Sequence, residues 1–409
     1  MAEFRILSLD GGGSWALIEV MALMDLFGGA DVKGHEVLRR FDLIAANSGG
    51  AIVLGALAKN MSLGELFDLI ANKDTNKRRT IFADLGFFSD VTDHLARTFG
   101  IGARYDTQKK LEGLTAILGA DGNRQVESLP DWIGVGKRNR KPQLVICAFD
   151  YDATRARFFR SDPQSLSGSF GQHGPVSLVQ AVHASANPPV NFFNNPTEFG
   201  DRRYWDGGIG GYNNPTLAAV IEAVANAGRY NTSIPEIKVL SLGTGNVVLP
   251  FLRVVPSGQK PVFIGQKESR SLKNDILKLA TSILDDPPDA ASFHAHILLG
   301  GRLPANPGPP VGDGPIVRMN PLIQPVRDAD DKLWVAPPGL DEESFKRLCK
   351  LDLAADEQTD VDLIRDFANA WLNDGVLNQP IRATGDSLTV EIGHRSYRDA
   401  KAQAIIFDF

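Results

Sequence analysis

One hydroxyl group stands at a sharp break in an apolar stretch of the sequence. Residues 41–58 read FDLIAANSGGAIVLGALA, in which a strand-like run stops at Asn47 and a small-residue helical pattern starts at Ser48. A strand-to-helix elbow holds its central side chain in a strained, exposed position, and small neighbours relieve the crowding. The stretch from Ala46 to Gly50 resembles the elbow pattern G-x-S-x-G with Ala in first place. Ser48 is therefore a candidate nucleophile, while a helix N-cap is the alternative.

A run of glycines follows the first strand-like stretch. Residues 4–10 read FRILSLD, and Gly11, Gly12 and Gly13 lead into a helical pattern at 14–27. In such a strand–glycine–helix turn, backbone N–H groups point into one space that the helix dipole also favours for anions. The turn can bind a phosphate group or the oxyanion of an acyl transfer. A plain tight turn is the alternative.

The same glycines raise the question of nucleotide binding. Gly11, Gly13 and Ala16 fit the dinucleotide pattern G-x-G-x-x-G/A. That pattern expects an acidic residue at the end of the second strand, where it binds a ribose. The second strand here ends in Asn47 and Ser48. The missing acid argues against a nucleotide-dependent oxidoreductase.

A nucleophilic hydroxyl needs a proton acceptor, and Asp206 is the first candidate. It opens the stretch DGGIGGYNNP, so that Gly207 and Gly208 follow it directly. Asp206 can accept the proton itself, provided that it is partly buried and hydrogen-bonded by these glycines. The alternative is an ordinary Asp-Gly turn.

Histidines are weaker candidates for the base. His294 and His296 lie in SFHAHILLG, where they read as structural residues on one face of a short apolar element. His183 lies in a helical stretch before Pro188, and its role stays open.

The elements that must position these residues alternate between strands and helices. Strand-like stretches occur at 4–10, 41–47, 142–161 and 237–245, and helical patterns occur at 14–27, 63–72, 105–119, 177–189 and 215–228. This alternation predicts an α/β fold, a three-layer α/β/α sandwich with a mainly parallel central sheet. Ligands bind at the carboxyl edge of such sheets. We therefore expect the glycine turn and the Ser48 elbow to lie side by side at that edge.

Composition limits the class of protein. The chain has 409 residues and a net charge of −6 at pH 7, which argues against nucleic acid as the main partner. Its two cysteines, Cys147 and Cys349, offer neither a disulfide framework nor metal spacing, which favours a reducing compartment. The N-terminal residues lack a signal-peptide pattern. The longest charge-free apolar run, 43–58, is shorter than the roughly 18 residues that a membrane span needs. We expect a cytoplasmic protein with peripheral membrane contact as an open option.

One further stretch mixes basic and aromatic residues without a clear period. Phe82, Leu85, Phe87 and Phe88 lie close to the basic run 77–79. The functional interpretation is a cap whose apolar side meets acyl chains while its basic side meets anionic head groups. The alternative is an ordinary loop with core anchors.

Five motifs, in this order, resemble the patatin-like phospholipase family. They are LSLDGGG (7–13), ANSGGAI (46–52), QAVHASANPPVNFF (180–193), WDGGIGGYNNP (205–215) and LSLGTG (240–245). The resemblance covers residues 4 to about 300 and extends more weakly to about 380. It implies a catalytic core at 4–220, a continuation of that core at 221–320, and a C-terminal helical segment and tail at 321–409.

The resemblance also implies a function. It implies a Ser–Asp dyad without histidine, carried by Ser48 and Asp206, and hydrolysis of fatty-acyl esters in lipids through an acyl-enzyme. It implies an oxyanion hole made by the backbone of Gly11, Gly12 and Gly13, with the N–H of Gly49. The expected substrate is a phospholipid or another acyl ester, and the expected chemistry needs neither a metal nor a cofactor.

Three positions depart from the family pattern. The glycine loop of the family continues with an Arg and a Gly, where this sequence has Trp15 and Ala16, and the first elbow Gly is Ala46. The added methyl of Ala46 fits a slightly opened elbow. Loss of the Arg opens an alternative, a catalytically weakened lipid-binding or storage protein on the same fold.

Overall fold

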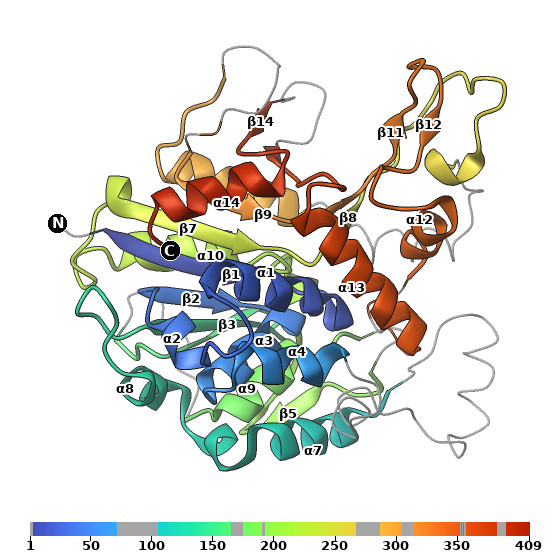
Figure 1. The fold of residues 1–409 in the computed structure, drawn as a ribbon. Helices are drawn as coiled ribbons and strands as arrows, with labels where there is room; N and C mark the ends of the chain where they lie inside the picture. Colours follow the sequence, from blue (N-terminus) through green and yellow to red (C-terminus); the bar gives the residue numbers. More distant parts are fainter. Residues whose placement is uncertain are drawn as a thin grey trace, which may run out of the picture.

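The strands and helices expected from the sequence assemble into stacked layers in the computed structural model (Figure 1). The structure describes residues 3–71, 105–164, 175–189, 193–266, 287–304, 312, 314–351, 353, 355, 357–382 and 390–409. The stretch 73–102, for which we expected either a lipid-facing cap or an ordinary loop, lies outside the described residues.

An eight-stranded central sheet carries the fold. Its strands follow the order β5-β6-β3-β2-β1-β7-β9, and β4 pairs with β3 outside this path. The bounds are β1 Phe4–Leu9, β2 Leu43–Ala46, β3 Gln143–Asp150, β4 Arg155–Arg160, β5 Thr197–Phe199, β6 Arg202–Asp206, β7 Ile237–Leu242 and β9 Ile316–Met319. Strands β3, β2, β1, β7 and β9 pair in parallel, whereas β4, β5 and β6 pair antiparallel with their neighbours. The predicted, mainly parallel sheet is confirmed.

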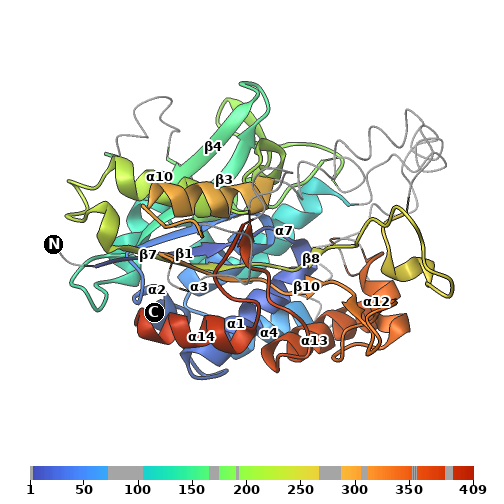
Figure 2. The same ribbon diagram turned by 90° about the horizontal axis from the view of Figure 1, so that it is seen from above.

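Helices cover both faces of this sheet, as the view in Figure 2 shows. Leu7 and Leu9 of β1 belong to the core beneath one group of helices, and Phe4 and Ile6 belong to the core on the other face. Side chains alternate along a strand, so β1 contributes to both cores. The first face carries α1 Leu17–Phe27, α3 Ser48–Ala58, α4 Leu63–Ala71 and α9 Leu178–Ser185, and the second carries α10 Thr216–Ala225 and the helical residues 287–298. The predicted three-layer α/β/α sandwich is therefore confirmed.

Three shorter or peripheral helices complete the described core. They are α2 Gly34–Leu38, α7 Thr107–Leu118 and α8 Leu129–Ile133. Helix α7 packs on α9, and the Asp106 side chain caps its N-terminus by accepting from the Lys109 N–H over 2.8 Å.

The strand register brings the candidate residues to one edge of the sheet. Leu9 at the end of β1 pairs with Ala46 at the end of β2. The glycine run follows Leu9 and the Ser48 elbow follows Ala46, so the two turns are neighbours. On the other side of β2, Ala148 of β3 pairs with Asp206 of β6. The candidate nucleophile, the glycine loop and the candidate base thus share the carboxyl edge of the parallel strands.

The C-terminal segment covers the face that carries α1 and α4 (Figure 1). The Gln358 side-chain amide of α13 donates to the Ala71 carbonyl at the end of α4 over 2.9 Å. The Tyr397 hydroxyl of α14 donates to the Asp25 carboxylate of α1 over 2.6 Å. The helices are α12 Glu342–Leu348, α13 Gln358–Leu372 and α14 Tyr397–Ile406, and the short strand pairs are β8 Asn246–Val247 with β10 Leu322–Ile323, β11 Val326–Arg327 with β12 Trp334–Val335, and β13 Ile381–Arg382 with β14 Glu391–Ile392.

The first helix begins later than its sequence pattern predicts. Residues Gly13–Ala16 form a 3₁₀ turn, and the α-helix starts at Leu17. The chain leaves the glycine run through Gly13 at φ +57°, a left-handed conformation that glycine adopts without strain. Within the described part of the chain, no helix has both the length and the apolar character that crossing a bilayer requires.

Candidate active site

Ser48 stands at a strained elbow between β2 and α3. It is the first residue of α3 and has φ +49°, a left-handed backbone that costs a non-glycine residue about 1–3 kcal/mol. Two hydrogen bonds hold the bend: the Ser48 N–H donates to the Ser185 hydroxyl over 3.0 Å, and the Gly50 N–H donates to the Asp10 carbonyl over 3.0 Å. A Cβ on Gly50 would lie 2.6 Å from the Leu9 carbonyl oxygen, so this position requires glycine. The elbow therefore presents one hydroxyl at the edge of the sheet.

Asp206 lies beside the Ser48 elbow. A side-chain interaction with Ser48 lowers the pKa of the Asp206 carboxyl group. The same carboxylate accepts from the Gly208 N–H over 2.8 Å and from the Asn47 side-chain amide over 3.0 Å. Its own N–H donates to the Asn187 carbonyl over 3.1 Å. The structure thus places the two residues that the sequence singled out side by side at one edge of the sheet, with the Asn47 amide bound to the Asp206 carboxylate.

Burial and hydrogen bonding act on the Asp206 pKa in opposite directions. Burial raises the pKa of this carboxyl group above its usual value, and the hydrogen bonds from Ser48, Gly208 and Asn47 lower it, as does the positive charge of Lys110. Burial prevails. A carboxylate with a raised pKa is the stronger base, which suits a group that must accept a proton from a hydroxyl.

Asn47 is a residue whose role the sequence did not reveal. Its amide N–H₂ donates to Asp206, and its amide oxygen accepts from the Ser185 hydroxyl over 3.5 Å. Gly207 packs against it so closely that a Cβ there would lie 2.4 Å from the Asn47 side-chain oxygen. Asn47 therefore fixes the orientation of the Asp206 carboxylate from the elbow itself. Its place directly before Ser48 was the only signal available.

The glycine loop lies against the elbow, but its three amides differ. The Gly11 N–H donates to the Asn213 carbonyl over 2.7 Å. This is contrary to the expectation that the Gly11 amide faces a developing oxyanion. Within the described residues, no acceptor is found for the N–H groups of Gly12, Gly13 and Gly49. Gly13 and Gly49 are adjacent, because a Cβ on Gly49 would lie 2.8 Å from the Gly13 nitrogen. These three amides form the candidate oxyanion site.

The position of Gly11 leaves no room for a side chain. A Cβ there would lie 2.9 Å from the Ser48 Cβ and 2.1 Å from the Asn213 side-chain oxygen. Its carbonyl accepts from the Thr244 hydroxyl over 2.8 Å, which ties the loop to the end of β7. Gly11 therefore allows the close approach of loop and elbow.

A buried cluster of ionisable side chains from β9, α1 and the end of β1 supports the glycine loop. The Arg318 guanidinium of β9 lies 2.5 Å from the Asp10 carboxylate and donates to the Ser241 hydroxyl over 2.8 Å. The Asp10 N–H donates to the Glu19 carboxyl over 2.6 Å. Burial raises the pKa of Asp10 to about 6 despite Arg318, and burial together with Asp10 raises the pKa of Glu19 well above its usual range. The sequence pattern gave no sign of this cluster.

Comparison with known families decides the class of protein. The model of the patatin-like phospholipase family matches residues 7–220, more than half of the chain. The chain belongs to the patatin-like phospholipase family. It therefore belongs with the lipid hydrolases, in agreement with the order of its motifs.

Solved structures give a more distant likeness. VipD from Legionella pneumophila aligns with a TM-score of 0.34 and 10% identity, over 90% of this chain and 67% of VipD. The type III effector protein ExoU aligns with a TM-score of 0.23 and 15% identity, over 46% of this chain and 39% of ExoU. A search of curated protein sequences gave no significant match. The assignment therefore rests on the family model.

Trp15, which replaces the Arg of the patatin-like pattern, packs against the C-terminal segment. Its ring meets Phe367 of α13 edge to face, with centroids 6.2 Å apart. Next to it, the Ser14 N–H donates to the Leu353 carbonyl over 2.9 Å, and the Ala355 N–H donates to the Ser14 hydroxyl over 3.2 Å. The departure from the family pattern thus coincides with a contact between the glycine loop and residues more than 300 positions away.

Within the described residues, no histidine takes part in the Ser48–Asp206 site. His183 donates from Nε2 to the Thr107 carbonyl over 3.0 Å and accepts at Nδ1 from the Thr197 hydroxyl over 2.5 Å. Burial and the nearby Lys110 charge lower its pKa to about 2, so it is neutral and structural.

The expectation that His294 and His296 share one face is wrong. Both lie in the helical residues 287–298, where positions two apart point in different directions. His294 is exposed, whereas His296 is buried and hydrogen-bonds the Arg302 carbonyl.

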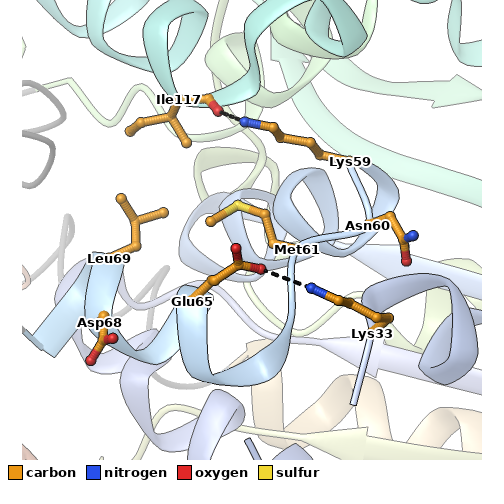
Figure 3. A pocket seen from close by; sticks show the side chains of 8 residues that line it. All are labelled: Lys33, Lys59, Asn60, Met61, Glu65, Asp68, Leu69 and Ile117. Carbon is orange, nitrogen blue, oxygen red and sulfur yellow. Dashed lines mark hydrogen bonds and ion pairs between the residues drawn. The ribbon is translucent and has the colours of Figure 1, made fainter. Parts of the chain in front are cut away.

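A cavity of about 440 Å³ opens at the far end of α3 (Figure 3). Lys33 faces Glu65 across it in an ion pair, and the Lys59 ammonium donates to the Ile117 carbonyl. The lining residues are Lys33, Lys59, Asn60, Met61, Glu65, Asp68, Leu69 and Ile117. None belongs to the Ser48 elbow or the glycine loop, so this cavity is separate from the candidate active site.

Proposed function

We propose that the protein is a lipid acyl hydrolase of phospholipase A or lysophospholipase type with a catalytic dyad of Ser48 and Asp206. The observation that carries this proposal is the placement of Ser48 beside the buried Asp206 carboxylate, which accepts from Asn47 of the same elbow over 3.0 Å. The left-handed elbow at Ser48 and the neighbouring glycine loop support it. Membership of the patatin-like family supports an ester of a lipid as the substrate.

The reaction proceeds in two halves through an acyl-enzyme. Asp206 accepts the hydroxyl proton as the Ser48 Oγ attacks the ester carbonyl carbon. The N–H groups of Gly12, Gly13 and Gly49 stabilise the tetrahedral oxyanion, an effect worth about 3 kcal/mol per donor. The intermediate collapses as the C–O bond of the ester breaks and the leaving alcohol takes the proton from Asp206.

The second half releases the fatty acid. Asp206, again deprotonated, accepts a proton from a water molecule that attacks the acyl-Ser48 carbonyl. The second tetrahedral intermediate uses the same amide donors and collapses to a free fatty acid, and the proton on Asp206 returns to the Ser48 Oγ. Asn47 and Gly208 keep the carboxylate in place through both halves, a role that no imidazole takes among the described residues.

The Ser48→Ala variant tests the proposal. It should retain the fold and lose at least about a thousandfold of the ester-hydrolysing activity, because nucleophile and acyl-enzyme are both removed. Product analysis of mixed phospholipids and lysophospholipids by mass spectrometry measures fatty-acid release and identifies the preferred head group. Full activity in the variant would contradict the dyad. No hydrolysis by the wild type, with lipid binding intact, would favour the storage alternative.

Because the proposed substrate is a lipid, we expect the protein to have a surface that binds a lipid bilayer. Phe251, Val254 and Val255 are 73%, 83% and 53% exposed and lie in one loop with the exposed Arg253. The segment 246–266 contains Arg253 and Lys260 but no acidic residue. The loop follows β7 and β8 at the edge of the sheet that holds Ser48 (Figure 1). We expect it to insert apolar side chains into an anionic bilayer surface beside the active site.

A further inference from the structure

Lys110 is a lysine with almost no access to solvent. It lies on α7, and only 1% of it is exposed. Burial lowers its pKa well below the usual value, which measures how unfavourable its surroundings are for an isolated charge. A buried ammonium persists only when other groups of the protein replace the water that it has lost.

The surroundings of Lys110 provide that replacement. Its ammonium donates to the Ala186 carbonyl over 2.6 Å, to the Asn187 side-chain oxygen over 2.9 Å and to the His183 carbonyl over 3.3 Å. Three N–H donors thus meet three oxygen acceptors. The Phe193 ring lies 4.1 Å from the ammonium and adds a cation–π contact. The carbonyls belong to the C-terminal end of α9, where the helix dipole favours a cation.

The same segment supports Asp206. The Asn187 carbonyl accepts the backbone N–H of Asp206 over 3.1 Å, while the Asn187 side chain is bound by Lys110. Lys110 and Asp206 also attract each other: the carboxylate raises the pKa of the lysine, and the ammonium lowers the pKa of the carboxyl group. Lys110 therefore acts on the candidate base in two ways. It binds the side chain of Asn187, whose backbone carbonyl accepts from the Asp206 N–H, and its charge lowers the pKa of Asp206.

We propose that Lys110 is a positioning residue for the reaction, whose buried ammonium fixes the Ala186–Asn187 backbone behind Asp206 and contributes a positive charge near the Asp206 carboxylate. This inference rests on the proposed function. Lys110 itself neither forms nor breaks a covalent bond in the reaction. It acts by stabilising the charged, correctly oriented form of the base before Ser48 attacks.

Other titratable groups nearby do not replace this charge. Burial and Lys110 itself lower the pKa of His183 to about 2, so it is neutral. Burial raises the pKa of the Cys147 thiol, which lies near Asp206, so this thiol is neutral as well. Lys110 is a cation whose charge lowers the pKa of Asp206.

The Lys110→Gln variant removes the charge and keeps side-chain donors for the carbonyls of α9. The Asp206 pKa should then rise, so the base should become protonated at a higher pH. We expect the acidic limb of kcat/KM, measured on a soluble short-chain ester, to move up by about one pH unit. We expect kcat to fall more than KM rises. The Lys110→Arg variant keeps the charge and should keep the acidic limb at the wild-type position.

Controls separate this inference from the function on which it rests. Lys109→Gln, on the same helix but exposed, should show the wild-type profile. If the wild type hydrolyses no ester, the proposed function fails. If the wild type is active and Lys110→Gln keeps its pH profile, the positioning role fails alone. Lys110→Met serves if the Gln variant does not fold, and failure of both neutral variants to fold would overturn the proposal in favour of a purely structural lysine.

Discussion

At the scale of single residues, burial sets the chemistry of the carboxyl groups around the two turns. Asp206 has a raised pKa because it is buried, yet four hydrogen-bonding or charged neighbours limit that rise. Asp10 lies in a similar balance, in which burial raises its pKa to about 6 and Arg318 opposes the rise. The two acids differ in their partners. Asp206 meets a hydroxyl that can react, and Asp10 meets a guanidinium that holds the loop.

The Arg318–Asp10 pair predicts a stability that depends on pH. Arg318→Met leaves the Asp10 carboxylate buried without its cation, so the free energy of unfolding at pH 7.5 should fall by about 3 kcal/mol. Because the folded-state pKa of Asp10 is raised, and rises further without Arg318, protonation relieves this loss as the pH falls. Urea unfolding should show a smaller deficit at pH 5 than at pH 7.5.

A matched double variant controls that experiment. Asp10→Asn combined with Arg318→Met removes both charges, and its stability should no longer show the pH-dependent part of the deficit. An Arg318→Met deficit of equal size at both pH values would contradict the assignment of the effect to Asp10.

At the scale of elements, the glycine loop joins the N-terminal core to the C-terminal segment. Trp15 packs on Phe367, and Ser14 hydrogen-bonds Leu353 and Ala355. A Cβ on Gly13 would lie 2.4 Å from the Leu353 carbonyl oxygen, so the segment rests directly on the loop. The amides proposed for the oxyanion are therefore held on one side by the elbow and on the other by residues before α13.

Trp15→Arg tests whether the loop needs the arginine of its family. The side chain at position 15 is buried, so the variant should place a charge against Phe367 and lower both stability and activity. The stability loss should reach at least the roughly 3 kcal/mol expected for removing a buried Trp side chain. Thermal unfolding and ester hydrolysis measure the two effects, with Trp15→Phe as the conservative control. A gain of activity with an unchanged Tm would show that the tryptophan weakens catalysis.

At the scale of the whole molecule, what sequence predicts depends on how local the signal is. Strands β1, β2, β3, β4 and β7 were predictable because apolar patterns and turn residues are local. Ser48 and Asp206 were predictable as candidates because each stands at the end of a strand, beside glycines. The contact of Lys110 with Asn187 and that of Arg318 with Asp10 were not, because they join positions 77 and 308 residues apart. Such pairs depend on tertiary packing.

The whole molecule also predicts how the protein approaches lipid. The loop at 251–255 and the two chain termini lie on opposite sides of the view in Figure 1. Phe251→Ser with Val254→Ser should reduce pelleting with anionic vesicles severalfold and leave hydrolysis of a soluble ester unchanged. Ile405→Ser with Ile406→Ser, at highly exposed positions of α14, is the matched control and should bind as the wild type does. Equal binding by the loop variant would remove this loop from the lipid surface.

The central claim is that Asp206 activates Ser48, and reaction with a fluorophosphonate tests it most directly. The probe forms a covalent bond only with an activated serine, and peptide mapping by mass spectrometry locates it. We predict that the wild type is labelled at Ser48, that Ser48→Ala is not labelled, and that Asp206→Asn is labelled at least a hundredfold more slowly while remaining folded. Labelling of Asp206→Asn at the wild-type rate, or labelling of the wild type at a different serine, would contradict the account.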